Sequence, residues 1–229
     1  MLLRPILTGL FLALLSPLAW AQYTDIPASD DGIGVVYMGR EIAHVMGHEG
    51  ADWLERPERT QEQPDRVIDA LQLKPTDVVA DIGAGTGYFS IRIAKKVPQG
   101  SVIGEDIQPE MIALMKANIA QANAANVKPL LGTTEDPDLP DGAVDKVLMV
   151  DAYHEFDKPL EMMRGIIKGL KPHGQVVFVE YRGEDPNVPI LPHHKMTEAQ
   201  LSKEMAAVGL HLMRKYEELP WQHVLFYGR

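Results

Sequence analysis

The chain has 229 residues, of which 45% are hydrophobic, and it carries a formal net charge of −10 at pH 7. This length and composition allow one substantial core and favour one α/β domain. The negative charge argues against a partner held mainly through phosphates, so we expect no nucleic acid among the partners.

The first 21 residues have the features of a secretion signal. A short positive start, Met1 to Arg4, precedes the apolar stretch Ile6 to Leu15, and Ala19-Trp20-Ala21 places small residues where a signal peptidase reads. We expect cleavage after Ala21 and a periplasmic or secreted protein, with an anchored, uncleaved leader as the alternative. No second such apolar stretch follows, so we expect no stable membrane span after cleavage. The chain has no cysteine, which excludes disulfides and thiolate catalysis.

From Gln61 onward, helical and strand-like segments alternate, as a doubly wound sheet requires. Apolar runs bounded by proline, glycine or polar residues predict the strands, and residues at helical spacing predict the helices. The expected helices are Glu62–Leu73, one after the turn at 83–87, Pro109–Asn123, one that Asp157 caps and that runs to Leu170, and one from Thr197 to Val208. The expected strands are Val78–Ile82, Ser101–Asp106, Val127–Leu131, Val144–Val150, Gln175–Glu180, Leu210–Tyr216 and Gln222–Tyr227.

The most informative stretch lies between the first of these strands and its helix. Asp81 ends a buried strand, and Gly83, Gly85 and Gly87 alternate in the turn that follows. Glycine can take backbone angles closed to other residues and leaves no side chain between the main chain and a ligand. The dinucleotide fingerprint G-x-G-x-x-G requires a third glycine where this chain has Tyr88. The turn is therefore better suited to a different nucleoside-like cofactor.

In these residues the chain resembles the class I methyltransferases that use S-adenosylmethionine. Their first motif is an acid, a spacer and three alternating glycines, and the resemblance runs from about Glu62 to the C-terminus. It implies a mostly parallel seven-stranded sheet closed by an antiparallel strand, S-adenosylmethionine as cofactor, and methyl transfer as activity. The cofactor-binding residues that we expect from this turn are Asp81, Gly83, Gly85, Gly87 and Tyr88.

Further cofactor contacts are expected at the ends of the next two strands. Asp106 ends the second strand, where an acid can accept hydrogen bonds from both ribose hydroxyls, with Glu105 the alternative if the register slips by one. The resemblance implies that Ile107 packs on the adenine. Many relatives place an acid after the third strand, and Thr133 occupies that position here, so a hydroxyl, backbone groups or Glu135 must read the adenine instead.

The fourth strand ends in Asp151-Ala152-Tyr153-His154-Glu155-Phe156, where an open parallel sheet places its chemistry. We assign Asp151 to the cofactor and His154, Tyr153 and Glu155 to catalysis. His154 can act as the base for a protonated acceptor, Glu155 can orient it or bind a cation, and Tyr153 can line the pocket or donate a hydrogen bond. A histidine that only supports its own loop is the equal alternative for His154. The stretch also lacks the Asn/Asp-Pro-Pro-aromatic motif of nucleobase methyltransferases.

Residues 22–61 lie outside the resemblance, at a place where this family often carries a lid over cofactor and acceptor. His44 and His48 would share one face of a helix and could join His154, His193 and His194 around a metal. The spacing is not H-E-x-x-H, and glycines weaken a helix here, so we expect a lid and no metal site. The expected organisation is a signal peptide over residues 1–21, a lid over 22–61 and a methyltransferase domain over 62–229.

We therefore expect a methyltransferase that acts on a small-molecule or lipid-like acceptor. The alternative is a non-catalytic exported protein that keeps the fold and binds a nucleoside-type ligand. The sequence names neither the accepting atom nor the oligomeric state.

Overall fold

The computed structural model describes residues 23–56, 59 and 61–229. The expected leader, residues 1–21, lies outside the described residues. Among the helices that are described, none combines the length and the apolar character needed to cross a bilayer.

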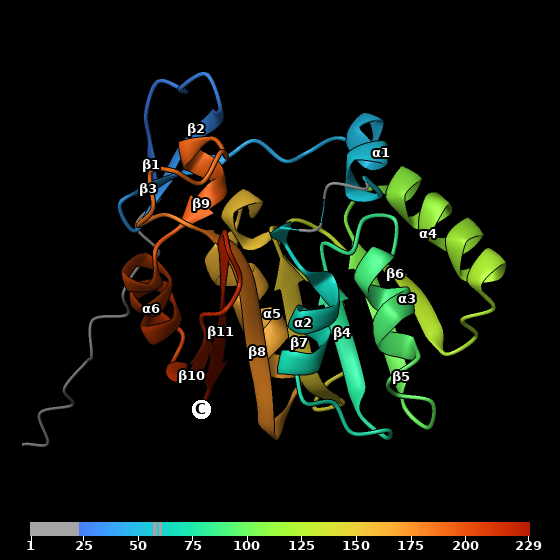
Figure 1. Cartoon of the computed structure of the whole chain (residues 1–229). Helices are drawn as coiled ribbons and strands as arrows, with labels where there is room; N and C mark the ends of the chain where they lie inside the picture. The colour runs from blue at the N-terminus through green and yellow to red at the C-terminus, as the bar shows by residue number, and fades with distance from the viewer. Residues whose placement is uncertain (1–22, 57–58, 60) are drawn as a thin grey trace, which may run out of the picture.

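A twisted central sheet organises the chain (Figure 1). Its strands are β4 (Val78–Ile82), β5 (Ser101–Asp106), β6 (Val127–Leu131), β7 (Val144–Val150), β8 (Leu170–Arg182), β10 (His211–Tyr216) and β11 (Gln222–Gly228). They lie in the order β10-β11-β8-β7-β4-β5-β6, and the short β9 (Lys195–Met196) pairs with β8. Strands β4 to β8 pair in parallel, and β11 runs antiparallel to both of its neighbours. This confirms the expected doubly wound, mostly parallel sheet.

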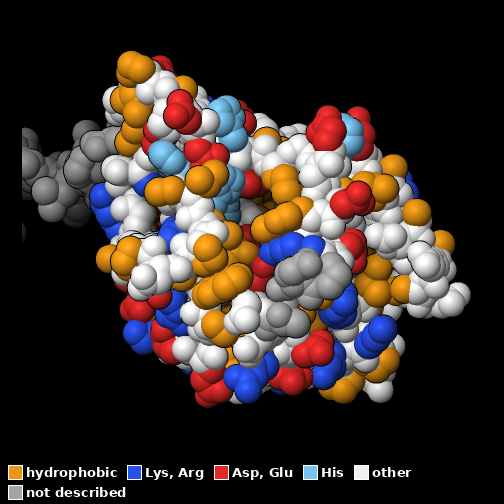
Figure 2. All heavy atoms as spheres, turned by 45° about the horizontal axis from the view of Figure 1, so that its top comes forward, with side chains coloured by type: hydrophobic (Ala, Val, Ile, Leu, Met, Phe, Trp, Pro, Cys, Tyr) orange, Lys and Arg blue, Asp and Glu red, His pale blue; other side chains and the backbone are white. Residues whose placement is uncertain are grey.

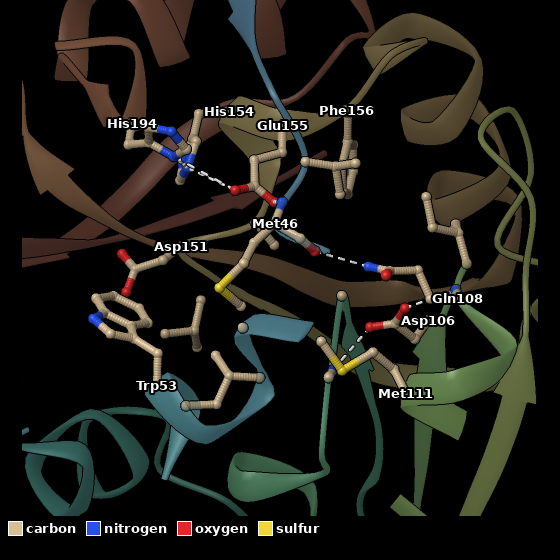
Figure 3. Close-up of a pocket in the computed structure, with 18 of the residues that line it drawn as sticks. Met46, Trp53, Asp106, Gln108, Met111, Asp151, His154, Glu155, Phe156 and His194 are labelled. Carbon is tan, nitrogen blue, oxygen red and sulfur yellow. Dashed lines mark hydrogen bonds and ion pairs between the residues drawn. The ribbon is translucent and has the colours of Figure 1, made fainter. Parts of the chain in front are cut away.

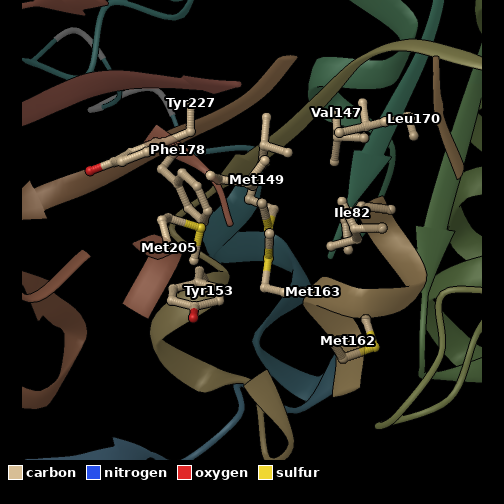
Figure 4. Close-up of a cluster of buried hydrophobic side chains, with 14 of the residues drawn as sticks. Ile82, Val147, Met149, Tyr153, Met162, Met163, Leu170, Phe178, Met205 and Tyr227 are labelled. Carbon is tan, nitrogen blue, oxygen red and sulfur yellow. The ribbon is translucent and has the colours of Figure 1, made fainter. Parts of the chain in front are cut away.

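Helices cover both faces of this sheet because successive strand residues point to opposite sides. The helices are α2 (Pro64–Ala70), α3 (Tyr88–Ala94), α4 (Pro109–Ala122), α5 (Pro159–Gly169) and α6 (Glu198–Ala207). Ala80 and Val147 pack with α5 and α6 in one cluster of buried side chains (Figure 4). Their neighbours Val79 and Leu148 pack with α2 and α3 in the other. Because both faces are buried, the strands can be almost continuously apolar.

Most expected boundaries agree with the structure to within a few residues. The strand predicted as Gln175–Glu180 is longer and begins at Leu170. The helix predicted from Glu62 begins at Pro64 and ends at Ala70. The Thr197 hydroxyl accepts a hydrogen bond from the Gln200 backbone N–H at 3.0 Å, as a capped helix start requires.

The segment before α2 is only partly helical. Strands β1 (Tyr23–Asp25), β2 (Gly32–Tyr37) and β3 (Arg40–Ala43) form a small antiparallel sheet, followed by the 3₁₀ turn η1 (His48–Gly50) and α1 (Ala51–Leu54). Strand β3 contacts two further 3₁₀ turns, η3 (Tyr153–Glu155) and η4 (Pro192–His194). His44 lies after β3 and His48 begins η1, so the helical face proposed for this pair does not exist.

Candidate functional site

A cavity of about 570 Å³ lies beyond the carboxyl ends of β4, β5 and β7. Figure 2 shows this side of the molecule hollowed near its centre, with histidine side chains gathered on one side of the hollow. The size is in the range of cofactor and small-ligand pockets. The walls come from the glycine turn after β4, the end of β5, η3, η4 and the segment around α1. The cavity thus joins the two regions that the sequence singled out.

Two of the three expected glycines line this cavity. Gly83 and Gly85 have φ angles of +69° and +54°, a region that side-chain-bearing residues rarely adopt. A Cβ on Gly85 would lie 2.5 Å from the Cδ1 atom of Leu54 in α1. Gly87, at φ +83°, does not line the cavity, and a Cβ there would lie 2.8 Å from Cγ of Met115. Gly87 therefore allows α3 to begin close to α4.

Asp106 connects strand β5 to the glycine turn. Its Oδ2 accepts a hydrogen bond from the Gly85 N–H and its Oδ1 accepts one from the Gln108 N–H, both at 2.9 Å (Figure 3). Burial raises the pKa of Asp106 although both backbone donors favour the charged form. Ile107 and Thr133 also line the cavity. All three residues expected near the ribose and adenine therefore lie on one wall.

Glu105 also reaches this wall. Its Oε2 lies 3.4 Å from the Gly83 N–H, and its buried Oε1 has no hydrogen-bond partner among the described residues. Burial, with the charge of Asp106 adding to it, raises the pKa of Glu105 to about 8. Glu105 therefore keeps its proton at neutral pH.

Asp81 and Tyr88 lie beside a small adjoining hollow of about 30 Å³ and not in the main cavity. The Asp81 carboxylate accepts a hydrogen bond from the Ser90 hydroxyl at 2.6 Å, and burial raises its pKa to about 6. Asp81 therefore links α3 to β4 by a hydrogen bond and also lies next to the turn. The guanidinium carbon of Arg59 lies 4.4 Å from the centre of the Tyr88 ring, and that of Arg92 lies 3.4 Å from it.

The segment before α2 also lines the cavity, with Val45, Met46, Trp53, Leu54 and Arg59, and we expected none of these side chains there. The Arg59 guanidinium is buried, donates to Glu62 Oε2 at 2.6 Å and faces both the cavity and the smaller hollow. Trp53 is 43% exposed and forms part of the cavity wall. The family motifs do not extend to this segment, so no sequence signal marked these residues.

Asp151 lines the cavity directly after β7, the strand that pairs with β4. Its backbone has a φ of +49°, and the Gln222 amide donates to both carboxylate oxygens, at 2.8 and 2.9 Å. Burial, with the nearby charges of Glu180 and Glu62, raises the pKa of Asp151 well above its ordinary range.

Histidine and carboxylate groups converge at the other end of the cavity (Figure 3). His154 Nε2 lies 3.0 Å from His194 Nδ1, and Glu155 Oε1 lies 3.8 Å from the first and 3.4 Å from the second. Buried Glu180 approaches His154 Nδ1 at 2.6 Å, and Asp31 lies 3.3 Å from His194 Nε2. Of the five histidines considered above, only these two converge, because His193 pairs with Glu41 and His48 lies beside Glu49. The hydrogen bond to Glu155 raises the pKa of His194.

Tyr153 does not take the catalytic position that we expected. Its side chain points into the hydrophobic cluster next to Phe178 and Met205 (Figure 4), and its hydroxyl donates to Glu204 Oε2 at 2.7 Å. The residue is 1% exposed and does not line the cavity. The 3₁₀ turn η3 directs Tyr153 inward and leaves its two successors facing the site, so the role assigned to Tyr153 is corrected to a structural one.

Comparison with known proteins places this geometry in a family. The family model described as a methyltransferase domain matches residues 73–223. An uncharacterized methyltransferase-like protein of Schizosaccharomyces pombe is 31% identical over 134 residues, which cover 58% of this chain and 49% of that protein. The demethylmenaquinone methyltransferase of Listeria monocytogenes is 25% identical over 144 residues, which cover 62% of this chain and 59% of that protein. The matches thus span about half the length of these relatives.

A solved structure shares the fold over nearly its full length. The SAM-dependent methyltransferase of Aquifex aeolicus superposes with a TM-score of 0.75 at 22% identity, covering 80% of this chain and 98% of that one. At this identity the likeness concerns the fold. The family match agrees with S-adenosylmethionine, the cofactor that the glycine turn led us to expect.

The residues of the cavity fit that cofactor. Two positions without side chains, Gly83 and Gly85, leave room beside the main chain, and a Cβ at either would lie within 3.0 Å of a neighbouring side-chain atom. With the cofactor bound, Asp106 would supply a carboxylate for the ribose hydroxyls and Ile107 an apolar surface for the adenine. Arg59, which is paired with Glu62, would face the carboxylate of the amino-acid part.

Proposed function

Because the chain belongs to the methyltransferase domain family, we propose that it transfers a methyl group from S-adenosylmethionine to a small-molecule or lipid-like acceptor. The observation that carries the proposal is that one cavity is lined both by the glycine turn with Asp106 and by His154, Glu155 and His194. Cofactor-binding and acid–base groups thus face the same space. The relative named for demethylmenaquinone, a small molecule, supports this acceptor class.

The side chains of this site have separate tasks in the proposed reaction. The bound cofactor would supply an electrophilic methyl carbon, and the protein must align the acceptor with it in a dry pocket. Met46, Trp53 and Leu54 cover the cavity from the lid side and exclude water. Glu180 holds His154 through Nδ1, so Nε2, which lies 3.0 Å from His194 Nδ1, is the nitrogen that would accept a proton from the acceptor as the new bond forms.

The test combines binding and turnover in one preparation. Calorimetry should detect uptake of S-adenosylmethionine, and a panel of phenol, quinol and amine acceptors should reveal release of S-adenosylhomocysteine. Thermal stabilisation by the cofactor with no product from any acceptor would favour the non-catalytic binding protein. Absence of binding by the folded protein would contradict both functions.

We also propose that the protein acts outside the cytoplasm, in the periplasm or as a secreted protein. The support is the pattern of residues 1–21, with a positive start, an apolar stretch and small residues before Gln22. Sequencing the N-terminus of the mature protein should give Gln22 as the first residue. An intact Met1 in the membrane fraction would indicate an anchored protein instead. An exported enzyme also requires a supply of S-adenosylmethionine outside the cytosol.

A further inference from the structure

The cluster at the end of the cavity opposite Asp106 has a composition that acid–base catalysis alone does not require. Two imidazole nitrogens and one carboxylate oxygen, from His154, His194 and Glu155, lie 3.0 to 3.8 Å from one another. A tetrahedral metal centre with bonds of about 2.0 to 2.1 Å separates its ligand atoms by roughly 3.4 Å. The observed separations bracket that value.

The partners on the far side of each ring determine which atoms face inward. Glu180 lies on Nδ1 of His154 and Asp31 lies on Nε2 of His194, so each carboxylate accepts the N–H of its ring. The nitrogens that face one another lie 3.0 Å apart, at hydrogen-bond distance, next to a third acceptor, Glu155 Oε1. With both N–H groups directed outward, these three atoms would repel one another unless a cation, either a proton or a metal ion, lies between them.

The surrounding charge points the same way. Asp31, Glu155 and Glu180 bring three carboxylates to two imidazoles, and in the described part of the chain no lysine or arginine forms an ion pair with any of them. Arg40 donates to the His154 carbonyl oxygen at 3.0 Å, but its charge is paired with Glu204. One Asp31 oxygen, Oδ2, is also buried without a partner among the described residues.

We propose that His154 Nε2, His194 Nδ1 and Glu155 Oε1 bind a divalent transition-metal ion of the zinc class. Two imidazoles and a carboxylate are a ligand set that such ions accept, and carboxylates behind the ligating histidines are the usual support of such sites. Glu180 and Asp31 are then positioning residues. The three ligands come from η3 and η4 and line the cavity, so a remaining coordination position faces the space for the acceptor.

This placement also indicates what the ion would do, and this step rests on the proposed methyl transfer. A bound ion would polarise an oxygen or nitrogen of the acceptor and lower its pKa, so that the acceptor binds as its conjugate base and its proton leaves to bulk water. His154 Nε2 cannot hold an ion and accept a proton at once, so metal occupancy makes His154 a ligand. The acceptor would then be a molecule that has a metal-binding oxygen or nitrogen close to the atom that is methylated.

The test measures metal binding without reference to turnover. The full chain is purified through an affinity tag that contains no histidine, and a chelator removes any bound metal. Near neutral pH it is then titrated with Zn²⁺, followed by calorimetry, and with Co²⁺, followed by visible absorption. We expect one ion per chain and cobalt bands typical of histidine ligation. The absence of uptake would overturn the proposal and leave a shared proton as the cation of the cluster.

Variants separate this cluster from adventitious binding. His194→Ala should abolish uptake, and because His194 is only partly buried this variant should fold. His193→Ala, one residue away but paired with Glu41, should bind as the unaltered protein does. Asp31→Asn should weaken binding about 10- to 100-fold. Unchanged uptake by a folded His194→Ala protein would contradict the site.

The same samples distinguish the two proposals. A protein that binds Zn²⁺ through His194 but does not bind S-adenosylmethionine would contradict methyl transfer and leave the metal site standing. A protein that binds the cofactor but no metal would contradict only the metal site.

Discussion

Leu54 lies directly over Gly85, so that a Cβ atom on Gly85 would be 2.5 Å from Leu54 Cδ1. The lid helix α1 and the glycine turn therefore approach as closely as a residue without a side chain allows. Both residues line the cavity. The position of α1 over the cavity therefore depends on the glycine.

Gly85→Val should abolish binding of S-adenosylmethionine. The branched side chain would displace Leu54 and enter the cavity, and φ +54° costs such a residue on the order of 1 to 3 kcal/mol. Calorimetry on the folded variant measures the loss. Gly142→Val is the matched control, because Gly142 has a similar φ of +59° but no atom within 4 Å of an added Cβ. Equal affinity in the two variants would show that the turn does not hold the cofactor.

Asp106→Ala should weaken the binding of S-adenosylmethionine by about 1 to 3 kcal/mol. The variant loses the acceptor for the ribose hydroxyls, and it also leaves the Gly85 N–H without its 2.9 Å partner. Glu110→Ala, an exposed acid in the first turn of α4, is the control and should keep full affinity. If the dissociation constants of the two variants agree, the ribose is bound elsewhere.

His154→Ala should lower turnover by about 10²- to 10⁴-fold while the affinity for the cofactor stays within experimental error. His154 lies at the end of the cavity opposite Asp106 (Figure 3), and both of its possible roles, base and metal ligand, concern the acceptor. Steady-state rates and cofactor titrations on the same sample separate the two effects. A fully active variant would leave His154 with the structural role that the sequence also allowed.

The sequence predicted the sheet well, and it singled out residues that line one wall of the cavity, because both features depend on local patterns. The apolar neighbours Val79 and Ala80 pack on opposite faces of the sheet, as a strand covered on both sides requires. The turn needs glycine because Gly83 and Gly85 have positive φ angles. The lid was predicted less well. Trp53 and Arg59 reach the cavity only because the segment folds back over it, and no periodicity within the segment encodes that contact.

The histidine cluster shows the same limit. His154 and His194 are 40 residues apart in the chain, and His193 is as close in sequence as His194 but pairs with Glu41. Which of the two faces the cavity depends on the phase of a single 3₁₀ turn, η4. Tyr153 was misassigned for a similar reason, since the turn η3 points it to Glu204.

Glu105→Gln should flatten the pH dependence of stability. The folded protein holds the Glu105 proton up to about pH 8, whereas the unfolded chain releases it near the ordinary value of 4.5. Between these values the folded state binds the extra proton, so the free energy of unfolding decreases as pH rises, by up to about 1.4 kcal/mol per pH unit. Above pH 8 the loss is complete.

Urea unfolding of the unaltered and variant proteins across this range measures the effect. The difference between the two profiles isolates Glu105, because Asp81 and Asp106, whose pKa values are also raised, contribute to both. The variant should gain stability relative to the unaltered protein as pH rises. Parallel profiles would mean that Glu105 is ionised in the folded state. Glu110→Gln, exposed on α4, should leave the profile unchanged.

Arg40→Met should destabilise the protein by about 3 to 5 kcal/mol, because it leaves the fully buried carboxylate of Glu204 without its cation. Arg40 comes from the small N-terminal sheet, and its Nη1 also donates to the carbonyl oxygen of His154, so the same change should disturb the histidine cluster. Urea unfolding gives the first effect. Zinc titration would give the second.

Two further variants make this last prediction specific. Lys203→Met removes an exposed contact to the Met38 carbonyl of the same small sheet and should cost about 0.5 kcal/mol or less. Adding Glu204→Gln to Arg40→Met should recover part of the loss, since the unpaired buried charge disappears while the Tyr153 hydroxyl keeps an acceptor. Additive losses in the double variant would show that the Arg40–Glu204 pair does not fasten the N-terminal sheet to the methyltransferase domain.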